Sequence, residues 1–292
     1  MREYDGKSVT IMSCRTCNTN CGHCYLGYEG DITSTELKDT VVKLSRHYDV
    51  DINGSEVLLN EGYFDSIKYV GQNRVLTNGI ILNSNPTLID KIKRYGIEWV
   101  CMSYHFDLHS KVSSVDFDLL KRNIELLKLK RLKIELMTTI STINYTEVLS
   151  MVNEAIKLGA DCIRFTNFLK LGNAVNMNND NLLSDEQIAI FFDQFYEAKD
   201  KYANQITARR SGTFGRDMRK ENSTYYCPAG RDKVAITPDK KVYPCPFLVS
   251  KGYEIGEYYD GKILINKEFK NDGTTCLTND IVNKNKILEL KI

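Results

Sequence analysis

Short apolar runs alternate with amphipathic helical patterns along the first half of this chain. Runs that read as strands recur from residues 9–13 to residues 161–168, and apolar residues between them recur at helical spacing, as Leu37, Val41 and Leu44 do. A β-α unit repeated about six times predicts a parallel sheet with helices outside it. Because such crossovers are right-handed, we expect an α/β fold that curls into a partial (β/α)6 barrel. Ligands of such sheets bind at the carboxyl ends of the strands.

The pattern changes after residue 168. Ser184 and Gln187 have the spacing of a capping box, which predicts a helix start, and the aromatic residues from Phe191 onward are expected to face inward. From about residue 208 the chain is irregular and carries cysteines, and residues 233–236 and 241–243 flank a predicted hairpin turn. We therefore expect the barrel over residues 1–183, a linking helix over 184–207 and a small appended domain over 208–292.

Composition and charge exclude several classes of partner. The 292 residues carry a formal net charge of only +1, which gives no electrostatic reason to expect nucleic acid or an anionic membrane as partner. No apolar stretch has the length of a membrane span or the form of a signal peptide, so we expect a cytoplasmic protein. Nine cysteines then favour metal ligation or catalysis, because a reducing cytosol disfavours disulfides and nine is an odd number.

Three cysteines gather in one loop directly after the first predicted strand. Cys17, Cys21 and Cys24 lie within eight residues of polar, glycine-containing sequence, which can wrap around one metal centre. A 4Fe–4S cluster offers four irons, so three protein ligands leave one iron open. An open metal position is what catalysis requires, whereas closed coordination suits a structural role. The pattern therefore indicates a catalytic iron–sulfur centre.

The alternative is a zinc site that uses Cys14 together with the three cysteines of this loop. Four cysteines in two C-x2-C pairs have a zinc-like composition. Only three residues separate the two pairs, however, and a tight structural site rarely opens a βα barrel. We expect Cys14 to be a small buried side chain instead.

The spacing C-x3-C-x2-C after a first strand, with Tyr25 beside the third cysteine, resembles the signature of the radical S-adenosylmethionine (SAM) superfamily. The resemblance implies that Cys17, Cys21 and Cys24 hold a 4Fe–4S cluster whose open iron is chelated by SAM. Reductive cleavage of SAM then yields a 5′-deoxyadenosyl radical, which takes a hydrogen atom from the substrate. A flavodoxin-like or ferredoxin-like protein is the implied electron donor, and His23 and Tyr25 lie in the stretch that contacts adenine in the family.

The segment that ends the second predicted strand resembles the family's Gly-Gly-Glu motif, which binds the amino group of SAM. Glycine allows close backbone approach and a carboxylate complements an ammonium, so we expect Gly54, Ser55 and Glu56 to bind SAM. Two positions depart from the motif, because Ser55 replaces the second glycine and Val57 replaces the usual proline. An ordinary turn is the alternative.

Polar residues on the later strands are also expected to contact SAM, by the same resemblance. Asn78 follows the third predicted strand, and Ser103 closes the fourth. Asn144 follows the fifth strand, where capping of the next helix explains it equally well. Arg164 lies on the sixth strand, where an inward side chain could pair with the SAM carboxylate or an acidic substrate group; an exposed arginine is the alternative.

Two further cysteines are candidate hydrogen donors. Cys101 shares a strand face with Ser103, and Cys162 shares one with Arg164, because side chains alternate along a strand. A thiol that faces the cleft could donate a hydrogen atom to a substrate radical, as the radical epimerases of the superfamily require. Packing inside the barrel is the favoured alternative for both.

The C-terminal cysteines resemble a second type of cluster site. Cys227-Pro-Ala-Gly230, followed by Val242-Tyr-Pro-Cys245, is similar to the start of a SPASM or twitch domain, which binds auxiliary iron–sulfur clusters. Lys240 stands where the family has glycine, and only Cys276 remains downstream. The resemblance implies one auxiliary iron–sulfur cluster in a small twitch-like cluster-binding domain, held by Cys227, Cys245 and Cys276. A zinc site or buried free thiols are the alternatives.

Relatives with such a domain mostly modify ribosomally made peptides by crosslinking, thioether formation or epimerisation, so we expect a peptide maturase. Because only a short segment precedes the first predicted strand, a separate peptide-recognition protein or a small-molecule substrate is slightly favoured over a built-in leader-binding domain. The alternative enzyme is a radical dehydrogenase or epimerase of a small molecule such as an aminocyclitol or sugar. The alternative of another class is a non-catalytic iron–sulfur or zinc protein.

Overall fold

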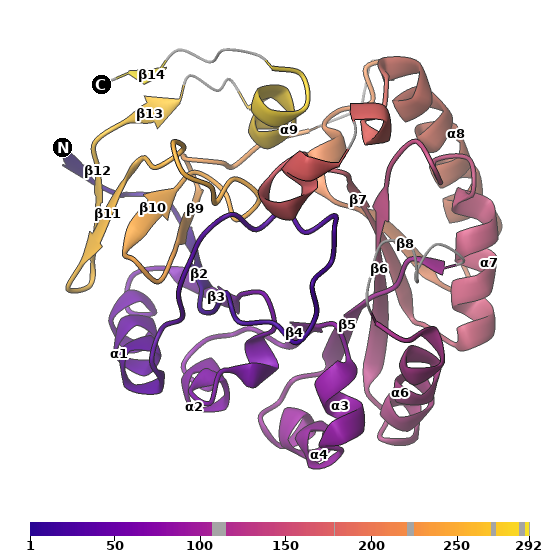
Figure 1. Cartoon of the computed structure of the whole chain (residues 1–292), viewed down its shortest axis with the longest axis horizontal. Coiled ribbons are helices and arrows are strands. Elements are labelled where there is room, and N and C mark those ends of the chain that lie inside the picture. Colours follow the sequence, from indigo (N-terminus) through magenta and orange to yellow (C-terminus); the bar gives the residue numbers. More distant parts are fainter. Residues whose placement is uncertain (107–114, 178, 221–224, 270–272, 286–289, 292) are drawn as a thin grey trace.

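The computed structural model describes residues 1–106, 115–177, 179–220, 225–269, 273–285 and 290–291. Parallel strands curve around a common centre with helices on their outer side (Figure 1). The strands of this barrel are β2 (Ser8–Met12), β3 (Asp49–Asn53), β4 (Arg74–Thr77), β5 (Trp99–Ser103), β6 (Lys133–Ile140), β7 (Cys162–Asn167) and β8 (Thr207–Arg210). β2 pairs with β3, and β4 to β8 form a five-stranded parallel sheet in chain order. The expected α/β fold with a parallel sheet is confirmed.

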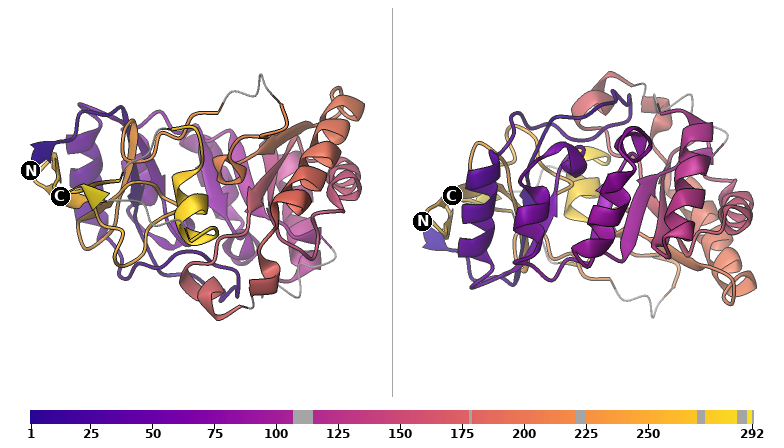
Figure 2. Two further views of the ribbon diagram at one scale, coloured as in Figure 1. Left: turned by 90° about the horizontal axis from the view of Figure 1, so that it is seen from above. Right: turned by 90° about the horizontal axis from the view of Figure 1, so that it is seen from below.

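Helices connect these strands and cover the outer face of the barrel (Figures 1 and 2). The α-helices are α1 (Ser34–Leu44), α2 (Tyr63–Ile67), α3 (Ile80–Ser84), α4 (Thr87–Arg94), α6 (Phe117–Leu129), α7 (Val148–Leu158), α8 (Asp185–Lys201) and α9 (Leu277–Val282). The short 3-10 helices are η1 (Val57–Leu59), η3 (Gly172–Asn176), η4 (Asn179–Asn181) and η5 (Gly212–Phe214). In the described part of the chain, no helix has the length and apolar character needed to cross a membrane.

The six predicted strands lie where β2 to β7 are found, and β8 adds a seventh parallel strand. β8 was not predicted because its sequence, Thr-Ala-Arg-Arg, contains a single apolar residue. α8, whose predicted capping box at Ser184 and Gln187 is confirmed, therefore leads into another strand of the barrel. The domain boundary expected after residue 207 falls inside β8, and the division into domains stays a prediction.

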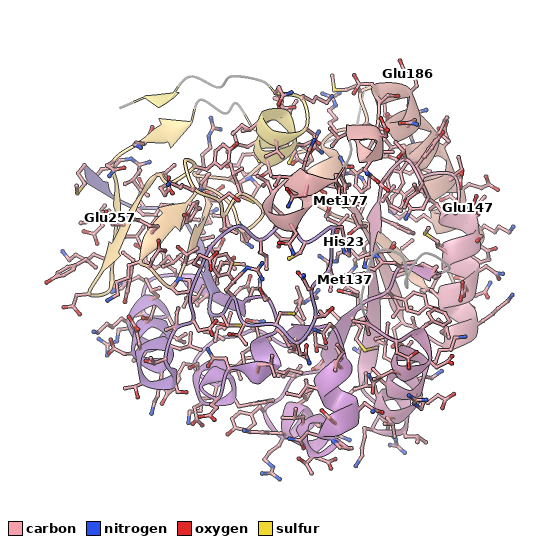
Figure 3. The ribbon with its side chains drawn as sticks, viewed as in Figure 1. His23, Met137, Glu147, Met177, Glu186 and Glu257 are labelled. Atoms are coloured by element: carbon pink, nitrogen blue, oxygen red, sulfur yellow. The ribbon has the colours of Figure 1, made fainter. Side chains whose placement is uncertain are left out.

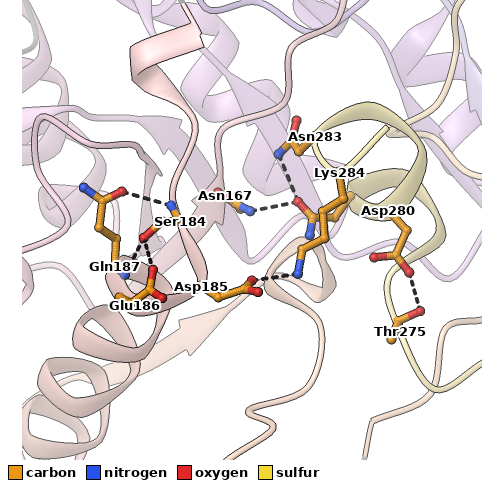
Figure 4. Close-up of polar contacts among 10 residues, drawn as sticks. Asn167, Ser184, Asp185, Glu186, Gln187, Thr275, Asp280, Asn283 and Lys284 are labelled. Atoms are coloured by element: carbon orange, nitrogen blue, oxygen red, sulfur yellow. Dashed lines mark hydrogen bonds and ion pairs between the residues drawn. The ribbon is translucent and has the colours of Figure 1, made fainter. Parts of the chain in front are cut away.

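The C-terminal strands extend the sheet that contains β2. β9 (Lys233–Ile236) pairs in parallel with β2, and β10 (Lys241–Tyr243), β11 (Gly256–Tyr259), β12 (Lys262–Ile265) and β1 (Arg2–Glu3) follow in antiparallel order. β13 (Glu268–Phe269) pairs separately with β14 (Leu290–Lys291). α9 lies at the carboxyl end of β7, where Asn167 Nδ2 donates to Asn279 Oδ1 at 3.1 Å (Figure 4). The segments that carry the N-terminal and the C-terminal cysteines are thereby connected to strands of the same sheet.

Alternation along the strands separates an apolar outer face from a mixed inner face. In β5, Val100 and Met102 belong to the main apolar core, together with Leu120 and other residues of α6. The residues between them in sequence face the other side. On the inner face, polar side chains are therefore available for chemistry without breaking the apolar contact to the helices.

Gln72 joins the mixed sheet that ends in β3 to the parallel sheet that begins with β4, because β3 and β4 make no strand pair with each other. Its Oε1 accepts from the backbone N–H of Ile52 at 2.6 Å, and its Nε2 donates to the carbonyls of Ile52 at 3.1 Å and of Arg74 at 2.8 Å. The side-chain amide of Gln72 thus takes the place of the backbone hydrogen bonds that β3 and β4 do not make with each other.

We expect Gln72→Ala to lower the free energy of unfolding by about 2 kcal/mol, because it removes three hydrogen bonds and leaves backbone groups of β3 without partners. Urea denaturation measures this change. Asn73→Ala is the matched control, since within the described residues the Asn73 side chain is exposed and makes no hydrogen bond. Equal stability of the two variants would contradict the bridging role of Gln72.

Candidate functional site

The cysteine loop, residues 13–33, leaves the carboxyl end of β2 and crosses the middle of the barrel (Figure 1). Cys17, Cys21 and Cys24 lie in it and are each partly exposed. A turn holds the last two close together, because the N–H of Cys24 donates to the carbonyl of Cys21 at 3.2 Å. Three soft thiolate donors in one loop with access to the barrel centre fit an iron–sulfur cluster.

The loop after β7 holds the cysteine loop from one side. Asn173 donates from its backbone N–H to the carbonyl of Cys24 at 2.9 Å, and its Nδ2 donates to the carbonyl of Cys21 at 3.1 Å. Gly172, at φ +57°, allows this approach, because a Cβ there would lie 2.6 Å from the carbonyl oxygens of Cys24 and Leu26. Backbone carbonyls beside two of the three thiols are therefore fixed from a distant part of the sequence.

Asn78 holds the cysteine loop from the other side. Its Nδ2 donates to Asn18 Oδ1 at 2.7 Å and lies 3.6 Å from the sulfur of Cys17. Burial raises the pKa of the Cys17 thiol, and the amide of Asn78 opposes this shift by hydrogen bonding to the sulfur. Asn78 thus contacts a predicted ligand, which the sequence alone did not indicate.

Residues 54–56, the segment that resembles a SAM-binding motif, contact Asn78 through Glu56. Glu56 is fully buried, and its Oε2 accepts from the backbone N–H of Asn78 at 2.7 Å and from Thr77 Oγ1 at 3.0 Å. Gly54 packs on Cys14, because a Cβ at residue 54 would lie 2.7 Å from the Cys14 sulfur. Ser55 donates from its N–H to the carbonyl of Cys14 at 2.8 Å. Glu56 therefore supports the Asn78 loop, and SAM binding by residues 54–56 stays a prediction.

Burial raises the pKa of Glu56 from 4.5 to about 7. Between these values the unfolded chain releases a proton that the folded chain keeps, so this group lowers stability as pH rises through that window. The total effect is up to about 3 kcal/mol. We expect Glu56→Gln to gain stability relative to the wild type from about pH 5 to about pH 8, as measured by urea denaturation of iron-free protein. Glu61→Gln, at an exposed carboxyl, is the control, and a constant difference between wild type and Glu56→Gln would contradict the prediction.

Cys14 is buried, whereas the other three thiols of the loop are partly exposed. Its side chain is 2% exposed, and its carbonyl accepts hydrogen bonds from the Tyr28 hydroxyl and from Ser55. Burial raises the pKa of its thiol to about 11. Among the described residues, no three Cys, His, Asp or Glu side chains converge as ligands of a single metal ion. In an iron–sulfur cluster the thiolates bind an assembly of irons rather than one ion.

His23 faces a small pocket at the ends of β5 and β6. The rings of His23 and His105 are 4.5 Å apart in an edge-on arrangement, and Asn144, Phe168 and Met177 line the same pocket. Figure 3 places His23 and Met177 toward the middle of the barrel. Contact of this pocket with a SAM adenine stays a prediction.

Asn144 does not cap the helix that follows it, which corrects one of the two explanations expected from its sequence position. Its Oδ1 accepts from the N–H of Ser141 at 2.8 Å, and its Nδ2 donates to the carbonyl of Thr139 at 2.9 Å. α7 begins after Glu147 without a side-chain cap. Asn144 thus closes the turn after β6 and shapes the pocket of His23.

Tyr25 connects the cysteine loop with the C-terminal cysteines. Its ring lies 5.3 Å from that of Phe247, and Phe247 donates from its N–H to the sulfur of Cys245 at 3.5 Å. Burial raises the pKa of Tyr25, and the neighbouring thiols of Cys24 and Cys245 act in the same direction. The two cysteine-rich parts of the chain therefore meet across this aromatic pair.

The three C-terminal cysteines are brought together. Cys227 and Cys245 belong to one apolar cluster with Leu277. Cys276 directly precedes Leu277, its thiol is influenced by the thiols of Cys227 and Cys245, and its sulfur caps α9 by accepting from the N–H of Asn279 at 3.5 Å. Burial raises the pKa of Cys245 to about 11 and of Cys276 to about 12. Backbone N–H groups aimed at sulfur favour thiolates, as a metal cluster requires. The grouping fits the expected auxiliary cluster, whose presence stays a prediction.

The inner face of β5, β6 and β7 carries the remaining predicted residues. Cys101 and Cys162 flank Glu135, because all three occupy one level of the sheet, and Ser103 and Arg164 lie at the next level. Cys101 donates to Glu135 Oε2 at 3.7 Å, and Arg164 pairs with Glu135. The structure therefore brings the two candidate hydrogen donors close to Arg164, and their role stays a prediction. Glu135 was missed, although a carboxylate within an apolar strand was the available signal.

No family model matches the chain, and no curated protein matches it. Solved structures match the chain in fold. SuiB of Streptococcus suis bound to the precursor peptide SuiA aligns with a TM-score of 0.70 at 12% identity, over 86% of this chain and 62% of SuiB. SuiB bound to SAM gives a TM-score of 0.70 at 14% identity, over 85% of this chain and 62% of SuiB.

Two further proteins extend the likeness. The protein anSMEcpe with bound AdoMet, which is SAM, gives a TM-score of 0.63 at 18% identity, over 86% of this chain and 77% of anSMEcpe. Coproporphyrinogen III oxidase (HemN) of Escherichia coli, a radical SAM enzyme, gives 0.50 at 10% identity, over 70% of this chain and 53% of HemN. The chain has the fold of radical SAM enzymes. At these identities the likeness concerns the fold, and the chain spans 62% of the length of the SuiB chain solved with SuiA.

Within this radical SAM fold, the sequence indicated the predicted cluster ligands but not the residues that hold them in place. The spacing of Cys17, Cys21 and Cys24 was evident in the sequence. The contacts of Gly172 and Asn173 with the cysteine loop were found only in the structure. The twitch identity of the C-terminal part stays a prediction.

Proposed function

We propose that this chain is a radical SAM enzyme whose 4Fe–4S cluster is held by Cys17, Cys21 and Cys24. The observation that carries the proposal is the placement of these thiols at the carboxyl end of β2, fixed by Asn78 on one side and Asn173 on the other. When bound, such a cluster with an open iron supplies the electron that cleaves SAM reductively to methionine and a 5′-deoxyadenosyl radical. A flavodoxin-like or ferredoxin-like protein is the proposed donor of that electron.

The chain's own residues position the cofactor in this proposal. Glu56 is hydrogen-bonded to Asn78 beside Cys17, and we assign the amino group of SAM to residues 54–56 together with Asn78. Ser103 and Asn144 contribute from the ends of β5 and β6, and His23 and Tyr25 bound the adenine side of the site.

We further propose a peptide as substrate and an auxiliary iron–sulfur cluster at Cys227, Cys245 and Cys276. SuiB was solved with the precursor peptide SuiA and anSMEcpe with the Cp18Cys peptide, and both share this fold. The contact between Tyr25 and Phe247 brings the C-terminal cysteines next to the cysteine loop, where an auxiliary cluster can accept an electron or hold substrate. These observations support a maturase that acts on a peptide within the barrel.

Label transfer tests this function. Full-length protein, reconstituted anaerobically and supplied with SAM and dithionite, is incubated with a deuterated short peptide encoded next to its gene. We expect deuterium to enter 5′-deoxyadenosine, because the radical takes its hydrogen atom from the substrate. Transfer from a deuterated aminocyclitol or sugar instead would overturn the peptide assignment, and absence of 5′-deoxyadenosine would overturn the radical SAM assignment.

A further inference from the structure

The inner face of the barrel carries more positive than negative charge below the cysteine loop. Glu135 on β6 is 0% exposed, and it accepts from Arg74 Nη1 on β4 at 3.2 Å and from Arg164 Nε on β7. One carboxylate thus lies between two guanidinium groups. Since arginine keeps its charge at any physiological pH, this group of three has a net charge of +1.

Arg209 on β8 adds another guanidinium to the same face. The register pairs Arg209 with Arg164 on the neighbouring strand, so the two side chains lie side by side. Its neighbours in sequence face outward, because Ala208 belongs to the apolar core and Arg210 lies over the Phe192 ring at 5.0 Å. Arg209 is exposed, and no acidic side chain of the described residues pairs with it.

The thiols of Cys101 and Cys162 on this inner face do not offset its positive charge. Burial raises the pKa of Cys101 and of Cys162 to about 12, so both are neutral near pH 7. Like charges opposite each other on neighbouring strands are unfavourable, and an anion placed between Arg164 and Arg209 would relieve this repulsion. The planar donor fork of arginine matches the two oxygens of a carboxylate.

We propose that Arg164 and Arg209 bind a carboxylate of the substrate, which is an acidic side chain or the carboxyl terminus of a peptide. The peptide identity of the substrate rests on the proposed function. Arg164 lies three residues before the end of β7, which is about 10 Å below the carboxyl edge. A carboxylate held at that depth anchors a substrate whose reacting carbon lies closer to the cysteine loop, and Arg164 then serves substrate rather than SAM.

The test compares two probes that differ only in charge. N-acetyl-glutamate N-methylamide and its glutamine counterpart are titrated into full-length reconstituted protein, and binding is followed by ligand-observed NMR. We expect the carboxylate probe to bind more tightly than the amide, and Arg209→Gln to weaken it about tenfold by removing a charge-assisted contact. Arg209→Lys keeps the charge and is expected to retain most of the binding. Arg210→Gln, at the adjacent outward arginine, is the matched control and is expected to bind both probes as the wild type does.

A parallel titration with SAM separates the two sources of a carboxylate. If Arg209→Gln weakens SAM and leaves the glutamate probe unchanged, the site belongs to the cofactor and the proposal is overturned. Equal binding of the glutamate and glutamine probes to wild-type protein would overturn it as well. SAM cleavage by the wild type is scored independently: cleavage without a carboxylate preference removes the anion site alone, whereas absence of cleavage removes the proposed function.

Discussion

Cys17→Ala is expected to abolish release of 5′-deoxyadenosine and to lower the iron content of the reconstituted protein by one cluster. The thiol of Cys17 is one of the three partly exposed thiols of the cysteine loop, and loss of one ligand leaves two irons open instead of one. Iron and sulfide analysis, with product detection by mass spectrometry, measures both effects.

Cys14→Ala is the matched control for this prediction, since Cys14 belongs to the same loop and packs against Gly54 in the interior. We expect it to keep its iron and its activity, with some loss of stability from the small cavity that it creates. If Cys14→Ala lost metal as completely as Cys17→Ala, four-cysteine coordination would replace the three-cysteine account.

Gly172→Ala is expected to lower the free energy of unfolding by at least about 2 kcal/mol, because it combines a positive φ with a backbone collision. The new Cβ would lie 2.6 Å from the carbonyl oxygens of Cys24 and Leu26, and backbone atoms have little freedom to move away. The cysteine loop would therefore shift, and we expect less iron per chain after reconstitution. Urea denaturation and iron analysis measure the two effects.

Gly22→Ala tests whether the effect of Gly172→Ala is local and steric. Gly22 lies between Cys21 and Cys24, yet a Cβ there has no heavy atom within 4 Å, and its φ is not positive. Its substitution is expected to change stability by no more than about 0.5 kcal/mol. Comparable losses in both variants would show that the cysteine loop tolerates no change at all, and the specific role of Gly172 would have to be given up.

The parts of the fold that could be predicted are those with a local signal. β9 and β10 match their predicted bounds, 233–236 and 241–243, because alternating apolar residues and turn residues are read within a few positions. β8 lacks that signal, since two of its four residues are arginines whose location in a strand depends on pairing with β7. Tertiary pairing, rather than propensity, decides that segment.

The residues of the candidate site also differ in whether a local sequence signal predicts them. The cysteine spacing is local, and so it was visible. The support that Gly172 and Asn173 give to the cysteine loop joins segments far apart in sequence, and no local pattern encodes such a contact. At Asn144 a local pattern was misleading. The sequence suggested a helix cap, but the side chain makes hydrogen bonds within the preceding turn instead. Gln72 likewise acts as a bridge only because two strands diverge there.

The most direct test of the account is the reaction of SAM with the full chain after anaerobic reconstitution with iron and sulfide. We predict that dithionite and SAM together yield methionine and 5′-deoxyadenosine, and that neither forms when the reductant is omitted. A protein that carries tetrahedral zinc on its four N-terminal thiolates, or one that is loaded with iron and leaves SAM intact, would contradict the central claim.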